Sequence, residues 1–254
     1  MTLSRREAVL MFGASSLIPA ACATAGSSAV SNVTEPELLY ANPLAKVEDV
    51  EGFQLEGSAH VSFDNQRLIL ENARPPEDGQ AANYVFWCPE VFPADVEISW
   101  EFQALREPGL CVFFFGASGL VNGQNVSLFD PRLAKREGLY PQYTQSDVSA
   151  LQISYFRRRF LDEQRLHVSV LRKAPGFELL DRQADPLPSA ETMKNAYKMR
   201  LRRKGRHIQF FIEDLTVIDW VAPSDLPLPD GGRLGFRQMA PLKAAYSNLK
   251  VTTT

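Results

Sequence analysis

Residues 95–103 read Asp95-Val96-Glu97-Ile98-Ser99-Trp100-Glu101-Phe102-Gln103, in which polar and apolar side chains alternate without a break. Because successive side chains of a β-strand point to opposite faces, the apolar residues share one face and the polar residues share the other. Alternation of this kind is typical of an antiparallel sheet that packs on the core with one face. The stretch therefore predicts a half-buried strand.

Similar short runs recur along the chain. They lie at His60–Phe63, Arg67–Glu71, Asn83–Cys88, Leu110–Ala117, Leu151–Arg159, Arg165–Arg172, Tyr197–Arg203, His207–Ile212, Arg233–Arg237 and Ala244–Val251. Turn-forming residues such as Lys204-Gly205 and Pro229-Asp230-Gly231-Gly232 separate them. About a dozen strands without helical periodicity between them predict an all-β fold, an antiparallel two-sheet β-sandwich.

The interval Ser118–Ser149 interrupts this pattern. It mixes aromatic and charged residues, as in Leu128-Phe129-Asp130-Pro131 and Tyr140-Pro141-Gln142-Tyr143, and shows no alternation. Loops of this length in a compact domain usually carry function or local structure of their own. We therefore expect a long loop that lies over the concave face of one sheet.

The N-terminus has the features of an export signal. Ser4-Arg5-Arg6 precedes an apolar run from Ala8 to Ala21, which is shorter than the roughly 20 residues that span a bilayer. The paired arginines resemble a twin-arginine signal, and Cys22 leaves a lipid anchor open as an alternative. We predict a signal peptide over residues 1–25, a flexible lead-in over 26–36, one sandwich domain over 37–254 and a periplasmic or secreted location.

Net charge and the positions of the cysteines limit the classes of partner and of metal site that the chain can have. A net charge of −3 argues against nucleic acid and anionic membranes as partners. Cys88 and Cys111 lie in apolar runs, which favours two buried free thiols over a disulfide. No Cys and His spacing suggests a metal site, and no cofactor is expected, although a structural calcium ion stays open.

Alternation also sorts the polar side chains into inward and outward sets. Over Leu151–Arg159 it places Leu151, Ile153 and Tyr155 in the core and leaves Gln152, Ser154, Phe156 and Arg158 on the open face. Over Arg165–Arg172 it places Leu166, Val168 and Val170 inward and leaves Arg165, His167 and Ser169 open. Leu234 and Phe236 are expected inward, with Arg233 and Arg237 outward. We predict that Glu101, Ser154, Arg158, His167 and Arg237 line one shared groove.

The chemistry of these residues favours an acidic sugar. Arginine presents a planar fork to a carboxylate, and histidine titrates near neutrality and can act as acid or base. Glu97 and Glu101 resemble part of the Glu-x-Asp-x-Glu motif of family-sixteen glycoside hydrolases, with Ser99 in the middle position. On a flat strand two residues four positions apart are separated by about 13 Å. A retaining glycosidase needs about 5 Å between its two carboxyl groups, so this pair would fit only on a strongly curved strand.

Several longer strings resemble the domain-of-unknown-function 1961 family of YesU-like proteins. They are Phe86–Pro93, Glu107–Cys111, Leu128–Pro131, Ile153–Arg158, Leu171–Lys173, Ala184–Pro188 and Gly235–Pro241. The resemblance spans roughly Leu39–Val251 and implies a concanavalin A-like jelly roll that works on acidic plant or algal polysaccharides, such as rhamnogalacturonan. Thr144 and Gln152 stand where the family pattern leads us to expect histidines, which puts catalytic activity in doubt.

We therefore expect a carbohydrate-active protein that takes part in degradation of a uronate-containing poly- or oligosaccharide, with lyase chemistry ahead of hydrolysis. An arginine or Gln238 would neutralise the uronate carboxylate while His167 or Tyr143 removes the neighbouring proton. Glu101 is the third catalytic candidate. The predicted substrate-binding residues are Gln152, Ser154, Arg158, Arg237, Gln238 and Tyr140. The alternatives are a non-catalytic carbohydrate-binding protein and a purely structural partner protein.

Overall fold

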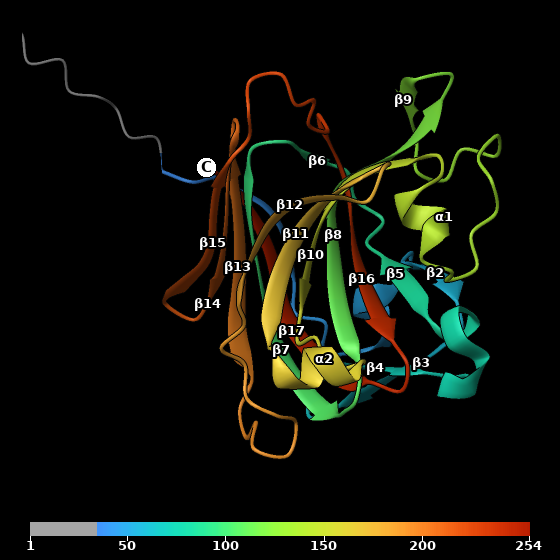
Figure 1. Cartoon of the computed structure of the whole chain (residues 1–254), viewed down its shortest axis with the longest axis vertical. Coiled ribbons are helices and arrows are strands. Elements are labelled where there is room, and N and C mark those ends of the chain that lie inside the picture. Colours follow the sequence, from blue (N-terminus) through green and yellow to red (C-terminus); the bar gives the residue numbers. More distant parts are fainter. Residues whose placement is uncertain (1–34) are drawn as a thin grey trace, which may run out of the picture. The chain divides into compact units, whose positions relative to one another are not determined.

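The computed structural model describes residues 35–254, and residues 36–254 form one compact unit. Two β-sheets, in which every paired strand is antiparallel, pack face to face in this unit (Figure 1). The predicted antiparallel β-sandwich is therefore confirmed. The predicted signal peptide and Cys22 lie outside the described residues.

The eight-stranded sheet is called sheet A here. Its strands are β1 (Leu38–Asn42), β3 (Ala59–Asp64), β4 (Arg67–Asn72), β7 (Val96–Arg106), β13 (Tyr197–Lys204), β14 (His207–Ile212), β15 (Leu215–Val221) and β17 (Lys243–Thr253). They follow the order β15-β14-β13-β7-β17-β4-β3, and β1 pairs with β17.

The nine-stranded sheet is called sheet B. Its strands are β2 (Gln54–Gly57), β5 (Tyr84–Trp87), β6 (Phe92–Pro93), β8 (Leu110–Val121), β9 (Gln124–Val126), β10 (Val148–Tyr155), β11 (Val168–Ala174), β12 (Glu178–Ala184) and β16 (Gly231–Met239). The order is β12-β11-β10-β8-β16-β5-β2, with β6 paired to β16 and β9 to β8.

The helical elements are short. They are the 3-10 helices η1 (Val47–Val50) and η2 (Pro76–Ala82) and the α-helices α1 (Pro141–Thr144) and α2 (Leu161–Arg165). Within residues 35–254 none of them combines the length and the apolar content that crossing a bilayer requires.

The main core lies between the two sheets. The apolar residues of β7 point into it as predicted, and Trp100 stacks on Phe113 of β8 with ring centroids 4.2 Å apart. Cys88 and Cys111 are buried here as free thiols, which confirms that prediction. The alternation of β7 thus reflects its place in sheet A, where one face of the strand packs on the core and the other face is polar.

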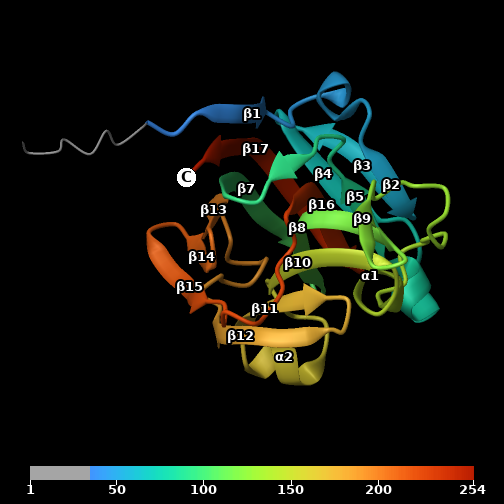
Figure 2. The ribbon, with the colours of Figure 1, turned by 90° about the horizontal axis from the view of Figure 1, so that it is seen from above.

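A second apolar cluster covers the outer face of sheet B, the concave face turned away from sheet A. Val85, Trp87, Val112 and Phe114 of this face pack against Tyr143 of the long loop. Figure 2 shows α1 and its loop on this side of sheet B. The predicted loop over the concave face is therefore present, and it makes much of that face a second core.

The structure corrects the predicted inward and outward sets on β11. On β11 the residues Ser169 and Leu171 face the main core, whereas Val168 and Val170 lie on the outer face of sheet B. Leu166 precedes the strand and is 72% exposed. When both faces of a sheet are apolar, alternation cannot tell which face is inside.

The set predicted over Leu151–Arg159 is partly right. Leu151, Ile153 and Tyr155 face the main core as expected. The strand ends at Tyr155, and Phe156 takes a left-handed conformation with φ of 48°, which turns its ring into the main core. The outward direction expected for Phe156 is therefore wrong, and strand alternation does not place Arg158.

Candidate functional site

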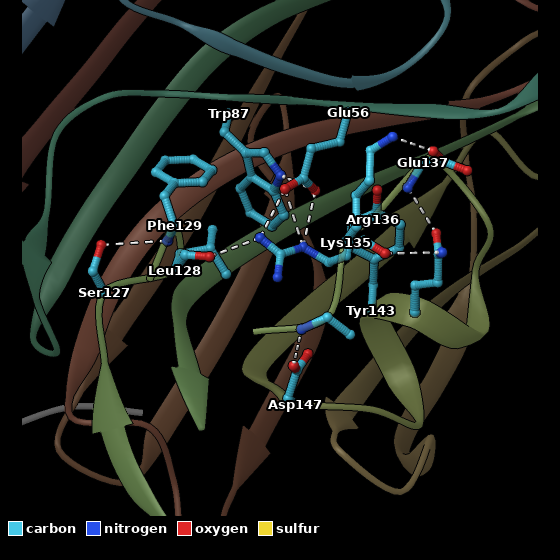
Figure 3. Close-up of polar contacts among 12 residues, drawn as sticks. Glu56, Trp87, Ser127, Leu128, Phe129, Lys135, Arg136, Glu137, Tyr143 and Asp147 are labelled. Carbon is cyan, nitrogen blue, oxygen red and sulfur yellow. Dashed lines mark hydrogen bonds and ion pairs between the residues drawn. The ribbon is translucent and has the colours of Figure 1, made fainter. Parts of the chain in front are cut away.

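A buried ion pair fixes the long loop to sheet B. Arg136 of the loop donates to both carboxylate oxygens of Glu56 on β2, with the shortest distance at 2.7 Å, and to the carbonyl oxygen of Leu128. The Trp87 indole donates to the same carboxylate at 2.9 Å (Figure 3). Together these bonds satisfy both ions, as a buried pair requires.

Arg237 of β16 is a second buried cation beneath the loop. Its guanidinium lies 4.8 Å from the ring centroid of Tyr140 and 5.4 Å from that of Tyr143, and it donates to the carbonyl oxygen of Gly138 and to Gln80 Oε1. Burial lowers the pKa of Arg237 to about 10, so the side chain is charged at neutral pH. The predicted outward direction of Arg237 is correct, but the loop encloses it.

Tyr140 links this buried region to the uncovered part of sheet B. Its hydroxyl donates to Gln152 Oε1 on β10 at 3.0 Å, and its ring meets Phe177 edge to face at 5.4 Å. Burial raises the pKa of the Tyr140 hydroxyl, while the positive charges of Arg237, Arg172 and Arg157 act in the opposite direction. Tyr140 therefore stays a protonated hydrogen-bond donor beside several cations.

Three arginines converge where the loop cover ends. Arg157, Arg172 and Arg182 line a cavity of about 280 Å³ formed by β11, β12 and the segment around α2, which we call the arginine pocket. Its other lining residues are Asp162, Glu163, Leu166, Val168, Val170 and Leu179. Burial lowers the pKa of Arg172, and the like charges of Arg157 and Arg182 act in the same direction. The pocket thus carries three guanidinium groups against two carboxylates, over an apolar floor.

Few of these cations are neutralised within the chain. Arg157 pairs with Glu163 and also donates to Ser154 Oγ at 3.1 Å. Arg172 donates to the carbonyl oxygen of Phe177 and lies 4.0 Å from that ring. Among residues 35–254 no carboxylate pairs with Arg172 or Arg182. The arrangement can accept an external anion.

Arg158 and His167 lie together in a different cavity. This cavity of about 390 Å³ is lined by Glu107, Pro108, Arg158, Gln164, His167 and Ser189, none of which lines the arginine pocket. Burial lowers the pKa of Arg158 and raises that of Asp185 behind it, while the charges of these two groups oppose both shifts. We call it the His167 cavity.

The groove predicted from alternation does not form as one site. Ser154 and Arg237 share the outer face of sheet B with Gln152, Tyr140 and Tyr143, whereas Arg158 and His167 occupy the His167 cavity. Glu101 lies on sheet A, where its carboxylate accepts from Ser247. Gln238 points into the main core and donates to the Tyr246 hydroxyl. The shared groove is a wrong prediction, because alternation says nothing of which sheet a strand joins.

The residues that sequence reasoning missed are the pocket arginines themselves. Arg172 and Arg182 are cross-strand neighbours of Gln152 and Val170, respectively, in the sheet register. The strand β12 was not predicted, so Arg182 was not assigned to any strand, and Arg157 is not among the predicted site residues. The pairing of Gln152 with Arg172 could have pointed to Arg172 as a site residue, but this pairing is known only once the strand register is known.

No metal centre is evident in the described part of the chain, where no three His, Cys, Asp or Glu side chains are grouped for coordination. Thr144, at one position where a histidine was expected, is buried and donates to the Tyr140 carbonyl oxygen. This hydrogen bond stabilises the single turn of α1. Gln152, at the other, is part of the concave face.

Comparison with known proteins gives a family and a fold. The uncharacterized protein YesU of Bacillus subtilis (strain 168) is 40% identical over 219 residues, which cover 85% of this chain and 96% of YesU. A Bacillus subtilis protein solved with a galectin-like fold has a TM-score of 0.80 at 39% identity, over 85% of this chain and 97% of that one.

More distant structures share the fold alone. The κ-carrageenase from Pseudoalteromonas carrageenovora, solved with an oligotetrasaccharide of κ-carrageenan, has a TM-score of 0.55 at 10% identity, over 90% of this chain and 99% of its own. The laminarinase from Rhodothermus marinus has a TM-score of 0.56 at 9% identity, over 86% of this chain and 97% of its own. The family model described as Domain of unknown function (DUF1961) matches residues 37–251. The chain therefore belongs to the DUF1961 family, as the resemblance of its sequence strings implied.

Proposed function

We propose that this protein recognises an acidic carbohydrate through the arginine pocket. The observation that carries the proposal is the convergence of Arg157, Arg172 and Arg182 on one open cavity in which Glu163 is the only carboxylate paired to them among the described residues. A uronate carboxylate can accept two parallel hydrogen bonds from one guanidinium. A sugar of this class would supply the missing negative charge.

The walls of the pocket suit a sugar ring as well as its charge. Val168, Val170 and Leu179 give an apolar surface for the C–H face of a pyranose. The κ-carrageenase and the laminarinase, which share the fold, are named for polysaccharides. Both points support a carbohydrate over another anion.

Recognition is better supported than chemistry at this pocket. No histidine lines it, and Glu163 is bound to Arg157 and accepts from the backbone amides of Arg159 and Phe160 at 3.1 Å. Both carboxylate oxygens of Glu163 are therefore already engaged by groups of this chain. The non-catalytic alternative thus ranks first for the arginine pocket.

Titration calorimetry tests the proposal. Wild-type protein should bind oligogalacturonates or alginate fragments saturably and should give no heat with neutral laminari-oligosaccharides. Arg182→Leu and Arg172→Leu should each weaken binding at least tenfold, since a charge-assisted hydrogen bond contributes about 1.5–3 kcal/mol. Arg200→Leu is the matched control, because Arg200 also lies over an aromatic ring, Phe211, but on sheet A. Equal binding of acidic and neutral oligomers would refute the proposal.

Lyase chemistry on the same class of glycan is a second candidate, and the His167 cavity favours it. Arg158 could neutralise a uronate carboxylate there while His167 removes the proton beside it. Incubation with pectic and algal uronans would then produce unsaturated sugars that absorb in the ultraviolet, and His167→Gln would abolish the signal. Reducing ends without absorbance would indicate hydrolysis, and no product with retained binding would leave recognition as the function.

A further inference from the structure

The arginine pocket has walls on most of its sides. β11 supplies the floor with Val168 and Val170, and the segment that carries α2 supplies one wall with Asp162, Glu163 and Leu166. Leu179 and Arg182 of β12 form the opposite side. Because β12 is the edge strand of sheet B, no further strand continues the surface beyond it.

The inner end of the pocket is closed by stacked side chains. Arg172 lies under the Phe177 ring, Tyr140 meets that ring edge to face, and the Tyr140 hydroxyl bonds to Gln152. Beyond Tyr140 the concave face is filled by Tyr143, which packs on Trp87 and Phe114. A glycan cannot continue from the pocket along the sheet in this direction.

Hydrogen-bond donors exceed acceptors at this closed end. Gln152 is 1% exposed, and its Nε2 atom has no partner within the described residues. Arg157 Nε is likewise buried without a partner. Unpaired buried donors are costly unless an acceptor reaches them. Arg157 and Arg172 both line the pocket, so one carboxylate can approach both guanidinium groups.

We infer that the pocket holds a single acidic sugar residue at the end of a chain, with its carboxylate toward Arg172 and Arg157. The cavity of about 280 Å³ lies below the range of about 300–1,000 Å³ typical of small-molecule sites, which leaves no room for several sugar rings. The next residue of the glycan leaves over β12 into solvent. This inference rests on the proposed function and specifies how much of the glycan that pocket reads.

A chain-length series tests it by calorimetry on the full protein. The probes are galacturonic acid, its dimer and its trimer, with galactose as the neutral control. The dissociation constants of the three acidic probes should agree within about threefold, with one probe bound per protein, and Arg172→Leu should weaken all three by the same factor of at least ten. Arg200→Leu should change none of them.

The outcomes separate the two proposals. Trimer binding more than about tenfold tighter than monomer binding would show an extended groove and overturn the inference, while the proposed function would stand. Absence of binding by every acidic probe would overturn the proposed function itself. If Arg172→Leu weakened binding of the trimer but not of the monomer, that result would also contradict single-residue recognition.

Discussion

Arg237 is the residue whose environment differs most from the expectation for its type. It is 0% exposed, and no described carboxylate lies close enough to pair with it. Two tyrosine rings, the Gly138 carbonyl oxygen and Gln80 take the place of a counter-ion. Sequence alternation correctly predicted its side of the strand, but a pattern of single residues contains no information on what a distant loop will cover.

Arg237→Ala should destabilise the fold by about 2–4 kcal/mol. The change removes the packing between two tyrosine rings and leaves the Gly138 carbonyl oxygen without its donor. Urea unfolding followed by tryptophan fluorescence measures the effect. Arg202→Ala, on the outer face of sheet A, should change stability by less than about 0.5 kcal/mol. Equal small effects for both variants would contradict a structural role for Arg237.

The two thiols of the core should resist alkylation. Burial raises the pKa of Cys88 to about 11 and also raises that of Cys111, so at pH 8 only roughly one Cys88 in a thousand is thiolate. Native protein should remain unlabelled by iodoacetamide at this pH, whereas both residues should react in urea. Mass spectrometry of the products decides, and a native disulfide or rapid native labelling would be at odds with the structure.

At the scale of elements, the loop Ser118–Ser149 determines what the rest of sheet B can do. The sequence correctly predicted a long connection at this place, but not its length, because residues 118–121 continue β8, Gln124–Val126 form β9 and residues 148 and 149 begin β10. The error on β11 has another cause, because Val168 and Val170 form the apolar floor of the arginine pocket and make the outer face of that strand apolar too. The edge strands β2, β12 and β15 were not predicted, because their sequences lack the regular alternation of β7.

Glu56→Gln should loosen this loop. It leaves Arg136, whose side chain is 4% exposed, as a buried cation without its ion-pair partner, which costs about 3 kcal/mol or more. Limited proteolysis should then cut within the loop faster than in the wild type. Glu137→Gln is the matched control, because its partner Lys135 is 84% exposed and such pairs contribute little. Equal cleavage of both variants would contradict the anchoring role.

At the scale of the whole molecule, we propose that the sandwich acts after export. The N-terminal residues with Arg5 and Arg6 have the pattern of a twin-arginine signal. Replacing both by Lys should retain the precursor in the cytoplasm, and cell fractionation with an antibody measures it. Cys22→Ser should leave the mature protein free in the periplasm if the signal is cleaved, whereas loss of membrane attachment in that variant would reveal a lipid anchor.

The sandwich and its family could be predicted from the sequence, because alternating runs and family-like sequence strings are local features. The candidate site could be predicted only in part. Gln152 and Ser154 lie next to Arg172 and Arg157, but those arginines and Arg182 were not predicted and are brought together by pairing of β10, β11 and β12. Strand order and register arise from packing of the whole chain.

The central claim is that an acidic sugar binds between α2 and β12 on the concave face. A crystal structure of the protein with galacturonic acid tests it most directly. We predict the carboxylate within about 3 Å of the Arg172 guanidinium, with the ring over Val170. A ligand found in the His167 cavity or on the outer face of sheet A, with the arginine pocket empty, would contradict the account.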